Sequence, residues 1–161
     1  MNWRRAAISF AAAALGLVEA KPMSASEDYD HLLRCAVYSS VVKEILRTSL
    51  HEVDDAKPVF VDVNTSASLA DSVVAALLDE KRRMLPASVC FRHRTGEGAC
   101  LLGPIMVLGP ISFDGKERAF APVAMFTRDS AGACGYTSNG RAGKWEATSE
   151  GVCKLYPRDK K

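Results

Sequence analysis

Val59-Phe60-Val61-Asp62-Val63 decides the fold class, because it lies between two segments with helical periodicity. Four of its five residues are β-branched or aromatic, and the valines alternate along the chain, so one face is apolar. We therefore predict a strand whose valine face is buried. Helical patterns flank this strand and only strand patterns follow, so we expect an α+β domain.

The segment before this strand has the pattern of one long helix. From Glu27 to about Leu50 there is no glycine or proline, and Ser24 with Glu27 is spaced as a capping box. Apolar residues recur at the three- and four-residue spacing of a single helix face. They are Tyr29, Leu32, Leu33, Ala36, Val37, Val41, Ile45 and Leu46. We expect this whole stripe to face the core.

The segment after the strand predicts a second helix. Ser68 with Asp71 is spaced as a capping box, although Ser66 is also a candidate for the helix start. Apolar residues continue at helical spacing as far as the basic run Lys81-Arg82-Arg83, which suits the negative end of a helix dipole. The helix is expected to end there, before Pro86.

Short strands with turn signals make up the second half. Strand candidates are Ser88 to His93, Ala99 to Leu108, Glu117 to Phe126, Cys134 to Thr137 and Lys144 to Thr148. Pro104, Pro110 and Pro122 cannot donate to a sheet ladder, so we expect bulges or edge positions there. In simple register across the last hairpin, Tyr136 faces Trp145.

These elements predict an antiparallel sheet of about five strands backed by the two helices. This arrangement buries both helical stripes against one face of the sheet. It looks like the roll of nuclear-transport-factor-2-like or cystatin-like domains, which is a likeness of fold and implies no function.

The N-terminal residues have the three-part plan of a secretory signal peptide. Arg4 and Arg5 precede thirteen uncharged, mainly apolar residues, and Val18-Glu19-Ala20 places small residues at the −3 and −1 positions of a cleavage site. Thirteen residues are too few to cross ~30 Å of hydrocarbon. We expect a cleaved signal at residues 1–20, a single domain at 21–161 with a short charged C-terminal tail, and a secreted or periplasmic protein without stable membrane insertion.

Charge excludes one class of partner. The chain has 161 residues, of which 48% are hydrophobic and 25% charged, and a formal net charge of +2. Without residues 1–20, 19 basic and 18 acidic residues remain. Nucleic-acid binding requires basic residues that neutralise several phosphates, so we expect no nucleic-acid partner. An envelope protein or a small ligand remains as the expected partner.

All five cysteines follow the predicted signal peptide. An oxidising compartment favours disulfides, and an odd number leaves at least one cysteine unpaired within the monomer. We predict two disulfides among Cys90, Cys100, Cys134 and Cys153, with a connectivity that the sequence leaves open. Cys35 is expected to be the free thiol, because burial in the long helix suits it as a small apolar group.

Three short motifs carry a resemblance to other proteins. They are Pro86-Ala87-Ser88-Val89-Cys90 after a helix, Cys134-Gly135-Tyr136, and Gly143-Lys144-Trp145. On these motifs the second half resembles uncharacterised exported bacterial proteins. The resemblance covers about half of the mature chain, and it implies no particular activity.

Patterns for catalysis, metals and cofactors are mostly missing from the sequence. There is no phosphate-binding glycine loop, no Gly-x-Ser-x-Gly elbow and no HExxH motif. His31 and Cys35 share a helix face and, with Cys90 and His93, could complete a zinc set, but disulfides compete for these cysteines. We therefore predict no catalytic residues, no metal and no cofactor.

Two functions remain open. The first is an exported, non-enzymatic binding protein of the inhibitor, immunity or accessory type. The second is a small hydrolase or ligand-processing enzyme with its site in the mouth of the helix-backed sheet, where Asp62, Tyr136 or Trp145 would line a cleft. An enzyme should hold a deep pocket with a convergent polar pair, whereas a binding protein should expose an apolar patch.

Overall fold

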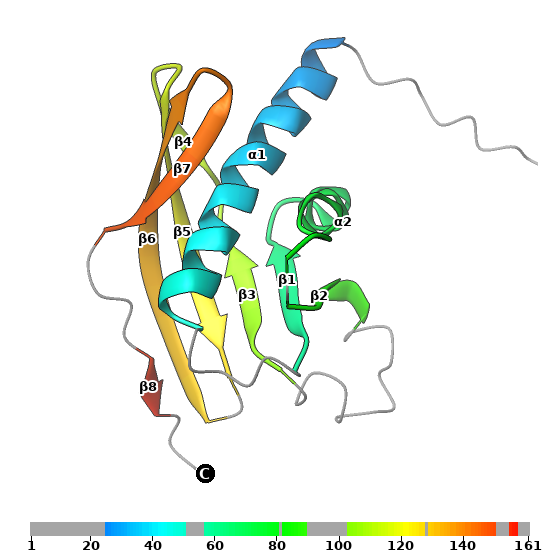
Figure 1. Ribbon diagram of the computed structural model, residues 1–161, viewed down its shortest axis with the longest axis vertical. Coiled ribbons are helices and arrows are strands. Elements are labelled where there is room, and N and C mark those ends of the chain that lie inside the picture. Colours follow the sequence, from blue (N-terminus) through cyan, green and yellow to red (C-terminus); the bar gives the residue numbers. More distant parts are fainter. Residues whose placement is uncertain are drawn as a thin grey trace, which may run out of the picture.

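A computed structural model describes residues 25–50, 57–80, 82–89, 103–127, 129–150 and 155–157 (Figure 1). The helices are α1 (Ala25–Thr48) and α2 (Ala67–Ala76). The strands are β1 (Val59–Val63), β2 (Met84–Pro86), β3 (Ile105–Leu108), β4 (Ser112–Asp114), β5 (Arg118–Phe126), β6 (Ser130–Arg141), β7 (Lys144–Ser149) and β8 (Tyr156–Pro157).

These strands form one mixed sheet. β1 lies between β2 and β3 and is parallel to both, and β5, β6 and β7 follow β3 as antiparallel neighbours. β4 pairs with β5, and β8 pairs with β6. The α+β class is confirmed, but the prediction of an antiparallel sheet of about five strands is wrong. The parallel pairing of β1 with β2 arises because α2 carries the chain from the end of β1 back to the start of β2, as a helical crossover does.

The main hydrophobic core lies between the two helices and one face of the sheet. Alternating strand residues point into it. They are Val59, Val61 and Val63 of β1, Met106 and Leu108 of β3, and Ala119, Ala121, Val123 and Met125 of β5. The predicted valine face of β1 is therefore confirmed, and the same core also includes buried residues of α1 and α2.

Only part of the predicted apolar stripe of α1 is buried in this core. Val37, Val41 and Ile45 are completely buried, whereas Tyr29 and Leu32 are 69% and 67% exposed. The expectation that the whole stripe faces the core is wrong at its N-terminal end. Figure 1 shows the reason: this end of α1 extends beyond α2, and the ends of the β-hairpins lie beside it.

α2 starts two residues earlier than the predicted capping box implies. Its N-cap is Ser66, whose side-chain oxygen accepts a hydrogen bond from the backbone N–H of Leu69 at 3.3 Å. Ser66 satisfies a donor of the first helical turn, as an N-cap must. The capping box at Ser68 and Asp71 is therefore wrong, and the alternative helix start at Ser66 is confirmed.

α2 also ends earlier than predicted, at Ala76 instead of near Arg83. The chain has to become extended by Met84 in order to pair with β1, and a turn at residues 77–79 directly follows the helix. Arg82 does not lie at a helix end. It is buried and donates a hydrogen bond to the carbonyl oxygen of Leu50 at 3.1 Å.

The strand after α2 is likewise displaced from its predicted position. It occupies Met84–Pro86, whereas the prediction placed it at Ser88 to His93. Ser88 and Val89 are helical, and residues 90–93 lie outside the described part. Parallel pairing with β1 selects the earlier segment, because Met84 lies opposite Val59 and continues the buried valine face.

Pro122 lies inside β5, a strand with partners on both sides. The prediction of an edge position or a bulge at this proline is therefore wrong. The partner of β5 changes next to this residue, because β4 pairs with residues 118–120 and β3 with 123–126. A proline is tolerated where no ladder hydrogen bond is needed from its nitrogen. Pro104 and Pro110 lie just outside β3, on either side of it.

The last hairpin turns through only two residues, Ala142 and Gly143. Their φ angles are 51° and 78°, and positive φ at both central positions is typical of a type I′ turn. This turn sets Gly140 opposite Trp145 and Tyr136 opposite Ser149. The predicted pairing of Tyr136 with Trp145 is wrong, because it assumed a longer loop between the two strands.

Some sequence predictions concern residues outside the described ranges. They are the signal peptide at residues 1–20, the capping residue Ser24, and the cysteines Cys90, Cys100 and Cys153. These stay predictions.

Candidate binding groove

One side of α1 and the adjacent strand β7 enclose a groove. Tyr29, Leu33, Ala36, Ser40, Lys43 and Arg47 line it on the helix. Their three- and four-residue spacing places them along one side of α1. β7 packs directly against this helix (Figure 1). We call the two hollows lined by these residues and by β7 the α1–β7 groove.

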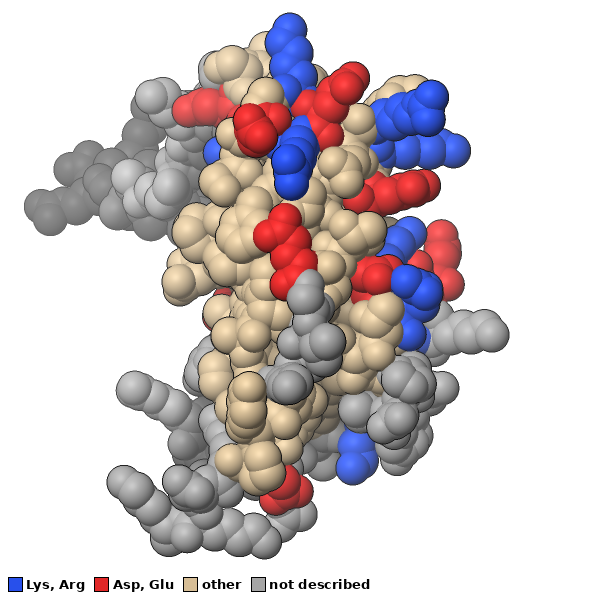
Figure 2. Space-filling view, turned by 90° about the vertical axis from the view of Figure 1, so that its left-hand side faces the viewer, with Lys and Arg blue, Asp and Glu red and all other residues tan. Residues whose placement is uncertain are grey.

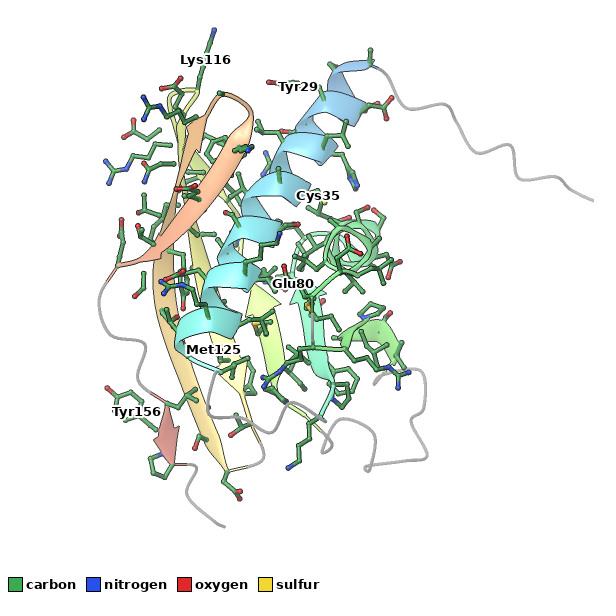
Figure 3. The ribbon with its side chains drawn as sticks, viewed as in Figure 1. Tyr29, Cys35, Glu80, Lys116, Met125 and Tyr156 are labelled. Atoms are coloured by element: carbon green, nitrogen blue, oxygen red, sulfur yellow. The ribbon has the colours of Figure 1, made fainter. Side chains whose placement is uncertain are left out.

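The upper hollow of the α1–β7 groove has a volume of about 400 Å³. Tyr29, Leu32, Leu33 and Ala36 form its helical wall, and Trp145 with the turns of two hairpins forms the other wall. Lys116 and Glu117 of the β4–β5 turn stand at its rim. Figure 3 shows Lys116 and Tyr29 at the same end of the molecule. An apolar hollow with charges at the rim suits an apolar side chain of a partner.

Contacts within the sheet and with α1 hold the Trp145 ring in place. The ring lies so close over Gly140 that a Cβ atom there would be 2.9 Å from it. Phe113 meets Trp145 in an edge-to-face contact, with 6.4 Å between ring centroids and 72° between the planes. The guanidinium of Arg34 in turn lies 5.5 Å from the Phe113 centroid. Because Trp145 is already ordered, binding against it costs little additional conformational entropy.

The lower hollow has a volume of about 280 Å³ and continues the α1–β7 groove along the helix. Lys43, Glu44 and Arg47 line it on α1, and Glu146 and Ala147 line it on β7, with Trp145 shared between the two hollows. The ammonium of Lys43 lies 3.3 Å from Glu80, and Arg47 lies 2.8 Å from Glu44. Both cations keep most of their side chains exposed, so they remain accessible to a partner.

Charges of both signs surround the upper end of the α1–β7 groove. An open hollow of about 710 Å³ between the two hairpin ends is lined by Asp114, Lys116, Glu117, Arg118, Asn139, Gly140 and Arg141. Figure 2 shows acidic and basic side chains interspersed over the upper part of the face that it displays. Mixed charge creates no strong net field, so partner choice has to depend on shape and on local contacts.

The structure does not bring together the three residues suggested for an enzyme cleft. Asp62 is half-buried and alternates with Val61 and Val63, so it lies on the sheet face away from the helices. Tyr136 is completely buried in the core. Trp145 alone lines the α1–β7 groove.

The two buried tyrosines near α1 act in packing. Tyr38 donates a hydrogen bond to the carbonyl oxygen of Gly109 at 2.7 Å. Burial raises the pKa of Tyr38, and the charge of Arg34 acts in the opposite direction. Burial also raises the pKa of Tyr136, whose hydrogen bonds with Ser49 and Thr48 act against this shift. Both phenols are therefore neutral at physiological pH.

The cysteines are described only in part. Cys35 is a free thiol, as the sequence predicts. Burial raises the pKa of this thiol, which keeps it protonated and weakly reactive at neutral pH. Cys134 is disulfide-bonded. The predicted pair of disulfides stays a prediction, because Cys90, Cys100 and Cys153 lie outside the described residues.

His31 connects the two helices. Its Nε2 atom lies 2.9 Å from the hydroxyl oxygen of Ser72, and this hydroxyl donates to the carbonyl of Ser68 at 3.0 Å. Ser72 therefore accepts the hydrogen bond from His31, which is the reverse of a histidine acting as base toward a serine nucleophile. Within the described part of the chain, no group of three or more potential metal-ligating side chains occurs.

Sequence reasoning missed the helical wall of the α1–β7 groove, because it assigned Tyr29, Leu32, Leu33 and Ala36 to the core. One signal was available. Acidic residues Glu27, Asp28 and Asp30 crowd the same turns of the helix, and burying those turns would desolvate several charges.

No family model, curated protein or solved structure matches this chain. Neither of the described helices has the length and apolar character that a membrane span requires.

Proposed function

We propose that this protein is an exported, non-enzymatic binding domain that holds a partner polypeptide in the α1–β7 groove. The observation that carries the proposal is the exposure of Tyr29 and Leu32 in a hollow whose opposite wall is Trp145. Single exposed apolar residues are ordinary on protein surfaces, but a cluster of them in a concave site is typical of interaction surfaces.

The composition of the α1–β7 groove supports a polypeptide partner. Its centre holds an ordered tryptophan flanked by apolar residues, and its rim holds Lys116, Glu117, Lys43 and Arg47. Aromatic anchors surrounded by a polar rim are the usual arrangement of protein-binding sites. The proposal that the protein is exported rests on the signal-peptide pattern of residues 1–20.

Site-specific photo-crosslinking tests the proposal in cells that export the protein. Leu32 is replaced by p-benzoylphenylalanine, and a matched variant carries the same residue at Leu78, which is 77% exposed and follows α2. We expect irradiation to give one discrete protein adduct from position 32 and none from position 78. Equal or absent adducts at the two positions would contradict a binding groove at this site.

A further inference from the structure

β7 ends the sheet order β2-β1-β3-β5-β6-β7. Antiparallel pairing alternates between residues that exchange hydrogen bonds and residues that do not. Arg141 and Lys144 flank the two-residue turn, so they form a hydrogen-bonded pair. By the same alternation, Asn139 and Glu146 form the next such pair.

Trp145 and Ala147 are the intervening residues of β7, so their backbone N–H and C=O groups point away from β6. Outside the strand ladder, no backbone hydrogen bond between described residues involves Trp145 or Ala147. Gly140, the partner of Trp145, supports the assignment, because its N–H donates to the carbonyl of Glu117 on the other side of β6. An outer edge of this kind is a template for an extended polypeptide.

α1 supplies a side wall for such a polypeptide. A strand added to β7 would direct every second side chain toward the helix. Near the hairpin end these side chains would meet Tyr29 and Leu32, and farther along they would meet Lys43 and Arg47. The side wall is therefore apolar at one end, and at the other it carries Lys43 and Arg47, which are paired with Glu80 and Glu44.

We infer that an extended segment of a partner protein adds to β7 as a further strand and lies in the α1–β7 groove. This segment carries an apolar side chain where it passes Tyr29 and Leu32, and an uncharged polar side chain where it passes the paired charges of Lys43 and Arg47. The inference rests on the proposed binding function and adds to it the mode of binding and the chemistry of the partner segment.

Amide hydrogen exchange tests strand addition directly. Random twelve-residue peptides displayed on phage are selected on the purified exported protein, with the Leu32→Asp variant for counter-selection. The enriched peptide is then added to ¹⁵N-labelled protein. We expect the amides of Trp145 and Ala147 to exchange about tenfold more slowly, because they gain hydrogen bonds. Glu146 and Thr148 are internal controls, because their amides already bond to β6.

Each other outcome overturns the inference in a different way. A peptide that binds without slowing exchange at Trp145 and Ala147 excludes strand addition but leaves a binding groove in place. If the exchange of these two amides slows without peptide as the protein concentration rises, a second copy of this chain occupies the edge of β7, which overturns a partner segment. A library without any Leu32-dependent peptide overturns strand addition, whereas the crosslink at position 32 decides the proposed function separately.

A proline variant gives an independent test on the same peptide. Ala147→Pro removes an N–H that points away from β6, whereas Thr148→Pro removes one that β6 uses. We expect Ala147→Pro to retain a native amide spectrum and to bind the peptide at least about tenfold more weakly, because the outward hydrogen bond is lost. Undiminished affinity in a folded Ala147→Pro protein would overturn strand addition. If this variant does not fold, the exchange measurement on the unmodified chain decides alone.

Discussion

The two halves of α1 carry the same apolar periodicity but have different surroundings. Val37, Val41 and Ile45 in the C-terminal half are completely buried, whereas Tyr29 and Leu32 in the N-terminal half are mostly exposed. All buried residues of α1 lie in the C-terminal half, which packs over the core formed with α2 and the strands. An apolar stripe therefore marks a helix face that favours burial, but it does not specify whether the same chain or a partner covers that face.

The largest expected effect comes from shortening one apolar side chain in each half. Ile45→Ala should lower the free energy of unfolding by about 2–5 kcal/mol, because it leaves a cavity in the core. Leu32→Ala should change it by less than about 0.5 kcal/mol, since Leu32 is exposed. Urea unfolding of both variants measures the difference. Similar losses would mean that the N-terminal half is packed within the protein.

Removing one tyrosine hydroxyl from each half of α1 should have an intermediate effect on the free energy of unfolding. Tyr38→Phe leaves the carbonyl of Gly109 without the hydrogen bond from Tyr38, and should cost about 1–3 kcal/mol. Tyr29→Phe is the matched control in the exposed half and should cost less than about 0.5 kcal/mol. Thermal unfolding followed by circular dichroism compares the two. An equal shift in Tm would contradict a structural role specific to Tyr38.

The smallest expected effect is a pH-dependent change in stability at Tyr136, which is buried near the C-terminal end of α1. Because burial raises the pKa of Tyr136, its neutral form stabilises the fold fully below the unfolded-state pKa of about 10, and this contribution is lost as pH rises through the folded-state pKa. Tyr136→Phe should therefore be about 1 kcal/mol less stable than the unmodified protein at pH 8. This deficit should shrink toward pH 11. Parallel Tm curves between pH 8 and pH 11 would disagree with the raised pKa.

Local patterns predicted the elements whose signal lies within a few residues. The valine face of β1 and the extent of α1 are examples, because alternation and helical spacing reflect burial on one face. The helix start at Ser66 is also a local signal. An N-cap side chain accepts a hydrogen bond from a backbone N–H three residues later, here that of Leu69. The short form of α2 was not predicted, because pairing between Met84 and Val59 overrides helix propensity there.

The α1–β7 groove was only partly accessible from the sequence. Trp145 was named as a candidate, but it was paired with Tyr136, and one wrong turn length displaced the whole register. The positive φ angles of Ala142 and Gly143 decide that register, and alanine gives no warning of such a conformation.

By itself, the sequence determined that this is an α+β chain with a long amphipathic N-terminal helix, near-neutral charge and the pattern of an export signal. The tertiary structure alone decided which apolar residues of that helix are buried, which strands are parallel and where a groove opens. The physical reason is that periodicity and composition are properties of neighbouring residues, whereas burial and register depend on segments far apart in the chain. Leu32 and Val41 therefore look alike in the sequence, and only their surroundings in the fold separate a surface residue from a core residue.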